Sequence, residues 1–266
     1  MAHTPVSGHR DRSTSAESRN PFTSDLSVNE FVLIENAGFE PLGLVLGTSI
    51  YQMGFQWARW DRNQEMTTLS QALYDAREAA MTRMEDEADA LGADGIVGVR
   101  LEVRKAPWTR NVTEFFAVGT AVRDIHGVSH RTVHNRPFTS ALSGQEFWLL
   151  MQHGYRPVSM VLGNAVYHIA WRNVANSLWA WGRSLELPHY TEAFYSAREL
   201  AVDRLHAEAA DAEADGVVGV RLEEHPNHWM GRFVEFLAIG TAVERFRDSA
   251  IDPPDLILTL NETDLL

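Results

Sequence analysis

The stretch that decides the fold is LGADGIVGVR, at Leu91–Arg100, which returns in altered form as AEADGVVGVR at Ala212–Arg221. In both places a helix-like pattern ends in an Ala-Asp-Gly turn, and a run rich in β-branched residues then predicts a strand. Working outward at this spacing of 121, 25 of the 50 positions from Leu73 to Val122 are identical in the second occurrence. Self-similarity of this extent at one fixed spacing indicates a tandem duplication.

The duplicated unit extends upstream, where the spacing is 116 and 15 of the 36 positions in 21–56 are identical. The second copy therefore has five additional residues, within the tryptophan-rich stretch 178–187. These limits predict a disordered tail (1–20), a first domain (21–123), a linker (124–134), a second domain (135–246) and an acidic, apolar C-terminal tail (247–266).

Local patterns predict the same α+β unit in each copy. Ser27 and Ser143 each begin an S-x-x-E capping box, which predicts a short helix that ends at Gly38 or Gly154. In the first copy we then expect a strand at 42–47, a long amphipathic helix at 68–91, and strands at 96–101 and 114–122, with counterparts in the second copy. One helix covers one face of such a sheet, so the other face needs a partner.

Composition excludes several classes of function. The 266 residues have a net charge of −13, which repels phosphate backbones, so we expect no nucleic-acid binding. The absence of cysteine excludes disulfides, thiolate metal sites and cysteine nucleophiles. The first residues lack a signal-peptide pattern, and no apolar run has the roughly 18 residues of a membrane helix, so we expect a cytoplasmic protein without membrane insertion.

Taken together, the segment Ala76–Val99 and the closing strand Glu114–Val122 resemble the YbjQ-like family, which is named for heavy-metal binding. The second copy repeats the resemblance at Ala197–Val220 and Glu235–Val243. The resemblance implies dodecin-like β-α-β-β subunits that assemble as pentameric rings, and it implies no established activity. One position departs from the pattern, because Glu213 stands where the first copy has Gly92, so the second long helix is expected to end without glycine.

No catalytic constellation recurs in both copies and no nucleotide-binding loop is present, so we expect a protein that is not an enzyme and has no cofactor. Asp94 and Asp215 are interpreted as turn-forming residues that accept hydrogen bonds from nearby backbone N–H groups. Arg77 and Arg198 are interpreted as members of ion pairs with a neighbouring element, because adjacent residues of a helix do not face each other.

Histidines provide two candidate metal sites. His126, His130 and His134 are spaced by four in the linker, and on a helix they would form a line able to bind a borderline metal. The glycine and β-branched residues between them disfavour that helix. His225 and His228 lie together on the second hairpin, but two histidines are too few for a tight site. We therefore predict no stoichiometric tight binding of a soft metal.

Two apolar features are candidates for binding. The aromatic candidates are Trp171, Trp179, Trp181 and Tyr195, which either line a small-ligand pocket or fill the core or an assembly interface. The C-terminal tail places an apolar run among acidic residues, at Leu256, Ile257, Leu258 and Leu260. Such a run suits docking on a groove or sheet edge of its own ring or of a protein partner, the alternative being a disordered tail.

The leading hypothesis is a non-enzymatic, ring-forming scaffold protein, and the alternative is an oligomeric module that binds a small ligand or a metal. A five-membered ring cannot be filled by two-domain chains without leaving a domain over. Five chains in two stacked rings would solve this, as would a single larger ring in which the copies alternate. The sequence favours the stacked rings, because the copies have diverged and the linker is short.

Overall fold

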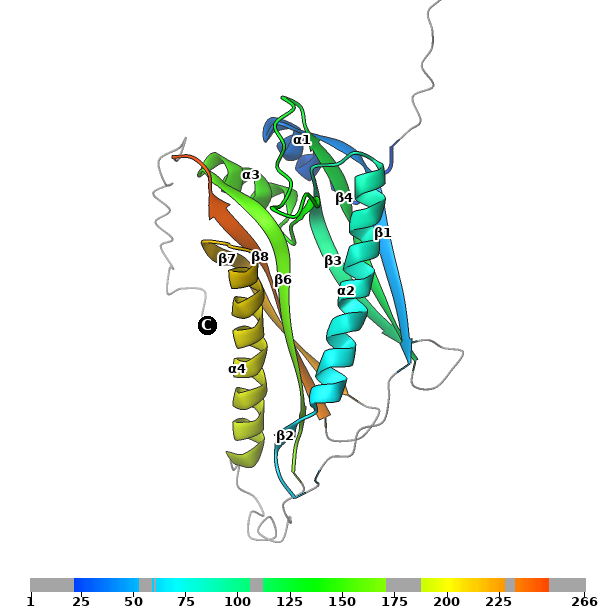
Figure 1. Cartoon of the computed structure of the whole chain (residues 1–266), viewed down its shortest axis with the longest axis vertical. Coiled ribbons are helices and arrows are strands. Elements are labelled where there is room, and N and C mark those ends of the chain that lie inside the picture. The colour runs from blue at the N-terminus through cyan, green and yellow to red at the C-terminus, as the bar shows by residue number, and fades with distance from the viewer. Residues whose placement is uncertain are drawn as a thin grey trace, which may run out of the picture.

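The computed structural model describes residues 22–52, 59, 61–105, 112–170, 188–227 and 233–248. These residues form an α+β protein with four helices and two four-stranded sheets (Figure 1). The first repeat contains α1 (Val28–Asn36), β1 (Phe39–Gln52), β2 (Gln64–Glu65), α2 (Thr67–Ala90), β3 (Gly95–Lys105) and β4 (Val112–Asp124). The second contains β5 (Phe138–Thr139), α3 (Gly144–Gln152), β6 (Tyr155–His168), α4 (Pro188–Asp211), β7 (Gly216–Asn227) and β8 (Phe233–Arg245). The predicted fold class, two tandem α+β units that each pack one long helix on a small sheet, is confirmed.

Both predicted capping boxes are present. The Ser27 hydroxyl accepts the backbone N–H of Glu30, and the Glu30 carboxylate accepts the N–H of Ser27. Ser143 has the same arrangement at the start of α3. After the short helices, Gly38 (φ 91°) and Gly154 (φ 79°) adopt the left-handed conformation that ends a helix.

Glycines inside the strands play two roles. Gly98 has φ 66°, and the pairing of β3 with β4 shifts register around it, which makes a β-bulge. Gly47 instead lets β1 approach α2, since a Cβ there would lie 1.9 Å from the carbonyl oxygen of Ala80. Gly163 occupies the same place beneath α4.

Each sheet is completed by a short strand from the other repeat. The strand orders are β1-β4-β3-β5 and β2-β6-β8-β7. β5 runs parallel to the edge of β3, with Phe138 opposite Gly95, and β2 runs antiparallel to β6. Neither strand was predicted from the sequence. Because of these exchanges, the repeats are joined through their sheets as well as through the linker.

The helix α2 packs between the two sheets. On one side it contacts its own sheet, at Val45, Phe115 and Ala117, and on the other the outer face of the second sheet, at Met160, Leu162 and Val166. In Figure 1, β6 accordingly lies between α4 and α2. The sheet face of the second repeat that needed a partner therefore receives it from the first repeat.

Candidate functional site: the interface between the repeats

A buried ion pair lies at the centre of the contact between α2 and the second sheet. The guanidinium of Arg77 is fully buried and donates to the carboxylate of Glu235 on β8, over 2.7 Å. It also lies over the ring of Phe115, 5.4 Å from the ring centre. The prediction that Arg77 pairs with a neighbouring element is confirmed. Removing one member would leave a buried charge unpaired, so this pair fixes how the repeats dock.

Further polar contacts extend along the same face of α2. The hydroxyl of Ser70 accepts the backbone N–H of Val166 (2.9 Å), and the Ser70 carbonyl accepts the side-chain amide of Asn164 (3.0 Å). One turn later, the Tyr74 hydroxyl donates to Glu208 on α4. This face therefore combines apolar packing with hydrogen bonds that fix its register on β6.

Acidic groups at this interface have raised pKa values. Burial raises the pKa of Glu78 to about 7, and the nearby carboxylates of Glu208, Glu85 and Asp75 add to the effect. Burial also raises the pKa of Glu208, although hydrogen bonds from Leu162 and Tyr74 lower it in part. The interface thus contains carboxyl groups that are easier to protonate than exposed ones.

The strand β5 docks through backbone hydrogen bonds and one ring. Phe138 donates its N–H to the carbonyl of Asp94 (3.0 Å), and Ser140 exchanges hydrogen bonds with Ile96 and Val99 on β3 (2.9 and 2.8 Å). The Phe138 ring lies directly over Gly95, where a Cβ would be 2.2 Å from it. Only glycine at position 95 leaves space for this ring.

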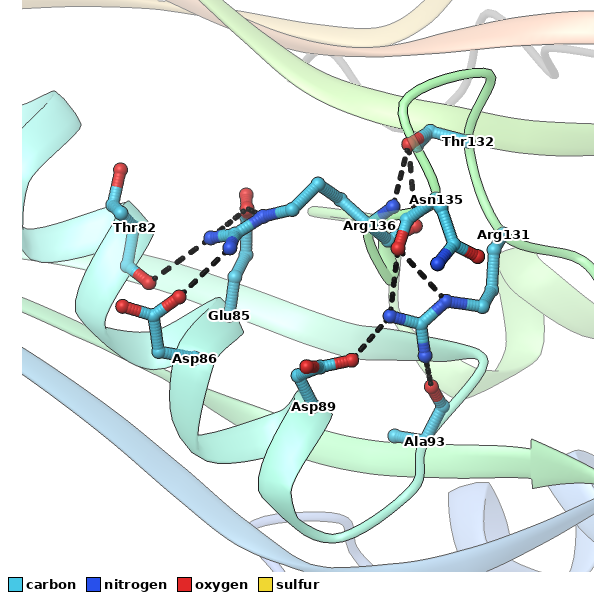
Figure 2. Close-up of polar contacts among 9 residues, drawn as sticks. All are labelled: Thr82, Glu85, Asp86, Asp89, Ala93, Arg131, Thr132, Asn135 and Arg136. Carbon is cyan, nitrogen blue, oxygen red and sulfur yellow. Dashed lines mark hydrogen bonds and ion pairs between the residues drawn. The ribbon is translucent and has the colours of Figure 1, made fainter.

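Two arginines, Arg131 in the linker and Arg136 just after it, anchor this part of the chain to the C-terminal half of α2 (Figure 2). Arg131 donates to the carbonyl oxygens of Ala93 (2.9 Å) and Asn135 and forms an ion pair with Asp89. Because one guanidinium binds both the helix end and the linker, the linker is held at the turn between α2 and β3.

Arg136 contacts α2 about one turn closer to the N-terminus of the helix than Arg131 does (Figure 2). It donates to the carboxylates of Glu85 (3.1 Å) and Asp86 (2.8 Å) and to the carbonyl of Thr82 (3.3 Å). We call Arg131 and Arg136 the linker clamp. The clamp fixes the chain immediately before β5, so that β5 is delivered to the edge of β3.

Comparisons with known proteins agree with this architecture. The family model described as "Putative heavy-metal-binding" (YbjQ) matches residues 61–124 and 157–245, more than half of the chain. The chain belongs to the YbjQ family. The YbjQ domain thus occurs twice, once in each repeat.

Relatives of this YbjQ protein differ in length. "Encapsulin nanocompartment protein Rv1762c" of Mycobacterium tuberculosis is 45% identical over 241 residues, which are 90% of this chain and 92% of the relative. A "UPF0145 protein" of Halorubrum lacusprofundi is 37% identical over 89 residues, 32% of this chain and 84% of the relative. "UPF0145 protein NP_2600A" of Natronomonas pharaonis is 46% identical over 59 residues, 22% of this chain and 55% of the relative. The last two therefore have about the length of a single repeat.

The histidines of the linker do not lie on a helix of this YbjQ protein. His130 is buried, with its Nε2 3.1 Å from Asp124 and its ring against Phe39. Although burial raises the pKa of Asp124, hydrogen bonds from the backbone of Val128 and His126, and from His130, hold it below its ordinary value. The aspartate therefore orders the start of the linker.

The other candidate metal ligands are dispersed. His126 and His134 are exposed, His225 lies 3.5 Å from Glu223, and His228 is outside the described residues. Within the part of the chain that the structure describes, no three His, Asp or Glu side chains are grouped as a metal site. Metal binding by these histidines stays a hypothesis from sequence.

The candidate binding aromatics and the tail are only partly described. Tyr195 lies on α4, is 58% exposed and is covered on one face by Arg198. Trp171, Trp179, Trp181 and the tail residues Leu256, Ile257, Leu258 and Leu260 lie outside the described residues. Among the helices that the structure describes, none is long and apolar enough to cross a membrane.

Proposed function

We propose that this chain is a non-catalytic structural protein that assembles with copies of itself and forms part of a protein nanocompartment. The observation that carries the proposal is the interface between the repeats, where Arg77 and Glu235 form a buried ion pair and the sheets exchange strands. These contacts join two copies of one domain within the chain, so the same pair of surfaces can also join one chain to the next. The Mycobacterium tuberculosis relative, covered over 92% of its length, is named an encapsulin nanocompartment protein, which supports the same proposal.

Two half-buried carboxyl groups with raised pKa values also support a structural role. Glu208 accepts hydrogen bonds from Tyr74 and from the backbone of Leu162, and Glu85 pairs with Arg136 of the linker clamp. Perturbed carboxylates at a catalytic site would face a substrate cleft. Here they join helices, a strand and the linker, so their chemistry serves the contact between the repeats.

Both arrangements of a self-assembled ring remain part of the proposal. Five chains in two stacked rings would place first and second repeats in separate layers. A single ring would place them alternately in one layer, and the pairing of β5 with β3 supports this second arrangement because it sets consecutive repeats side by side. The cytoplasm is the proposed compartment, on the basis of the sequence.

Native mass spectrometry and electron microscopy of the purified chain at micromolar concentration test the proposal. We expect a closed particle of several identical chains, without colour and without stoichiometric metal. A monomer would overturn the structural role. A ligand-binding absorption band or one metal per chain would replace it with the alternative of a binding module.

A further inference from the structure

Equivalent positions in the two repeats differ in burial, and the differences define two open surfaces. The first is the α4–β7 face of the second repeat, made of Thr191, Tyr195, Arg198, Gly216 and Val220. Its counterpart in the first repeat is the part of α2 and β3 that the second repeat covers. Val220 is 49% exposed while Val99 is fully buried, and Arg198 is exposed while Arg77 is fully buried.

The second open surface lies on the first repeat, and we call it the N-terminal face. It is made of Phe22, Leu44, Leu46, Ile50 and Glu114. Its counterparts in the second repeat are the residues that bind α2 and β3. Side chains are exposed by 51% at Phe22, 41% at Leu46 and 58% at Ile50, against 1% at Phe138, 1% at Leu162 and 0% at Val166.

The two faces fit each other at a glycine slot. Gly95 is required because the ring of Phe138 lies over it, but Gly216, its counterpart, has no atom of the described chain within 4 Å of a Cβ. Phe22, the counterpart of Phe138, is exposed and stacks on Phe31 as Phe138 stacks on Phe147. The slot on the second repeat and the ring on the first repeat that fits it are therefore both open.

The two open faces carry the same types of polar residue that form the interface between the repeats. Arg198 and Glu114 are the counterparts of the buried pair Arg77 and Glu235. In the same way, Tyr195 and Glu87 are the counterparts of Tyr74 and Glu208, and Glu87 already accepts the N–H of Leu46 as Glu208 accepts that of Leu162. Each open face thus presents the partner that the other one needs.

We propose that the α4–β7 face of one copy binds the N-terminal face of the next copy, by the same contacts that join the two repeats within a chain. Phe22 then covers Gly216, and the segment that begins at Phe22 adds a strand to the edge of β7. Such a heterologous contact repeats from chain to chain, and it gives the proposed ring when the rotation between successive copies closes. First and second repeats alternate around that ring, in place of two stacked layers. The inference rests on the proposed self-assembly and specifies its surface.

The contact between chains differs from the contact within a chain at two places. Within the chain, Gly144 packs so close to Glu30 that a Cβ at position 144 would lie 2.7 Å from a side-chain carbon of Glu30. The counterpart of Gly144 is Val28, so the same place in the contact between chains has less space. The linker clamp has no counterpart, since α4 has His206 and Ala207 where α2 has the acids that bind Arg136. The contact between chains is consequently weaker and depends on protein concentration.

A charge swap tests the proposal on the full chain. Arg198→Glu places a carboxylate against Glu114 of the next copy, and Glu114→Arg places two guanidiniums together, so each variant should change the native mass from the oligomer to a single chain. The double variant restores an opposite pair and should recover the oligomer. Glu192→Arg is the matched control, because its counterpart Gln71 stays exposed with the second repeat docked.

The outcomes separate this inference from the proposed function. A wild-type monomer would remove both. A wild-type oligomer that persists in Arg198→Glu and Glu114→Arg would keep self-assembly and overturn this surface. Single variants that dissociate without recovery in the double variant would overturn the pairing of Arg198 with Glu114.

Cross-linking gives a second test that does not depend on charge. Ile96 and Thr139 are register partners in the β3–β5 pair, and their counterparts are Val217 and Thr23. Because the chain has no cysteine, Thr23→Cys/Val217→Cys should form disulfides only between copies, giving a ladder of covalent multimers that ends at the number of chains in the ring. Bands no larger than those of either single-cysteine variant would overturn the proposed strand addition.

Discussion

At the scale of single residues, Glu213 shows that a left-handed turn can form without the glycine that normally favours it. The sequence predicts that α4 ends without glycine, and the structure shows the same left-handed turn, with φ 56° at Glu213 and 70° at Gly92. The hydrogen bond from Ala214 to Ala209 (3.1 Å) closes the turn. A residue with a Cβ is strained in this conformation by about 1 kcal/mol.

Glu213→Gly should therefore raise the free energy of unfolding by about 1 kcal/mol, and Gly92→Glu should lower it by a similar amount. Urea unfolding at one fixed chain concentration measures both changes. Equal stability of Glu213→Gly and the wild type would show that the side chain compensates for the strain of the backbone.

The buried pair of Arg77 with Glu235 gives the second prediction at this scale. Arg77→Met leaves the buried Glu235 carboxylate with only the ring of His225, 4.0 Å away, and should cost about 3–5 kcal/mol, and Glu235→Gln should be costly because it leaves the buried guanidinium unpaired. Arg77→Met/Glu235→Gln should cost clearly less than the sum of the two. A double-mutant cycle measures the coupling, and additive effects would mean that the pair does not hold the repeats together.

At the scale of elements, the sequence predicted those helices and strands whose stabilising interactions lie within one segment of the chain. Each of the short helices could be predicted from its own capping box, at Ser27 or Ser143. The long helix α2 could be predicted from its three-and-four spacing of apolar residues. β2 and β5 could not be predicted in this way, because a two-residue strand has no periodicity and its partner lies in the other repeat. The pairing of Arg77 was predicted only as far as "a neighbouring element", since its partner depends on how the repeats dock.

The acidic face of α2 predicts a pH dependence. The pKa of Glu78 is raised to about 7 by burial and by nearby carboxylates, so the folded chain retains a proton that the unfolded chain has lost between about pH 4.5 and 7. Its contribution to stability is present below about pH 4.5 and is lost as pH rises through 7. Stability should therefore increase when the pH falls from 8 to 5.

Urea unfolding at intervals of one pH unit measures this trend. Glu78→Gln keeps the shape of the side chain and removes its titration, so it should flatten the profile between pH 5 and 8. Glu192→Gln removes an exposed carboxylate on α4 that does not act on Glu78, so it is the matched control and should retain the slope. A wild-type profile that falls toward pH 5 would contradict the assignment to Glu78.

At the scale of the whole molecule, duplication followed by divergence explains why one chain has both a strong and a weak version of one contact. Within the chain, the linker clamp at Arg131 and Arg136 reinforces the docked repeats. In the proposed contact between chains, the same faces lack the clamp. A chain would therefore fold as a fixed pair of repeats and assemble afterwards, with its stoichiometry set by the weaker contact.

The C-terminal tail gives the prediction that concerns the assembled particle. The described chain ends where Phe246 donates its N–H to the carbonyl of Gly154 (3.0 Å) and Arg247 donates to that of Met151 (2.8 Å), at the end of α3. In the proposed ring, every copy thus starts its tail from the same fixed point. Several identical tails on one particle bind a partner with far higher avidity than one tail alone.

We predict that ending the chain at Arg247 leaves the particle intact and abolishes its co-sedimentation with high-mass nanocompartment particles of the source cell, because the apolar run Leu256–Leu260 makes the contact. Replacing Leu256, Leu258 and Leu260 with serine, which retains the acidic residues, should have the same effect. A shortened chain that dissociates would show that the tail docks on its own ring. The apolar run has two proposed contacts, its own ring and a partner particle. A shortened chain that keeps both its native mass and its co-sedimentation would show that the run makes neither contact.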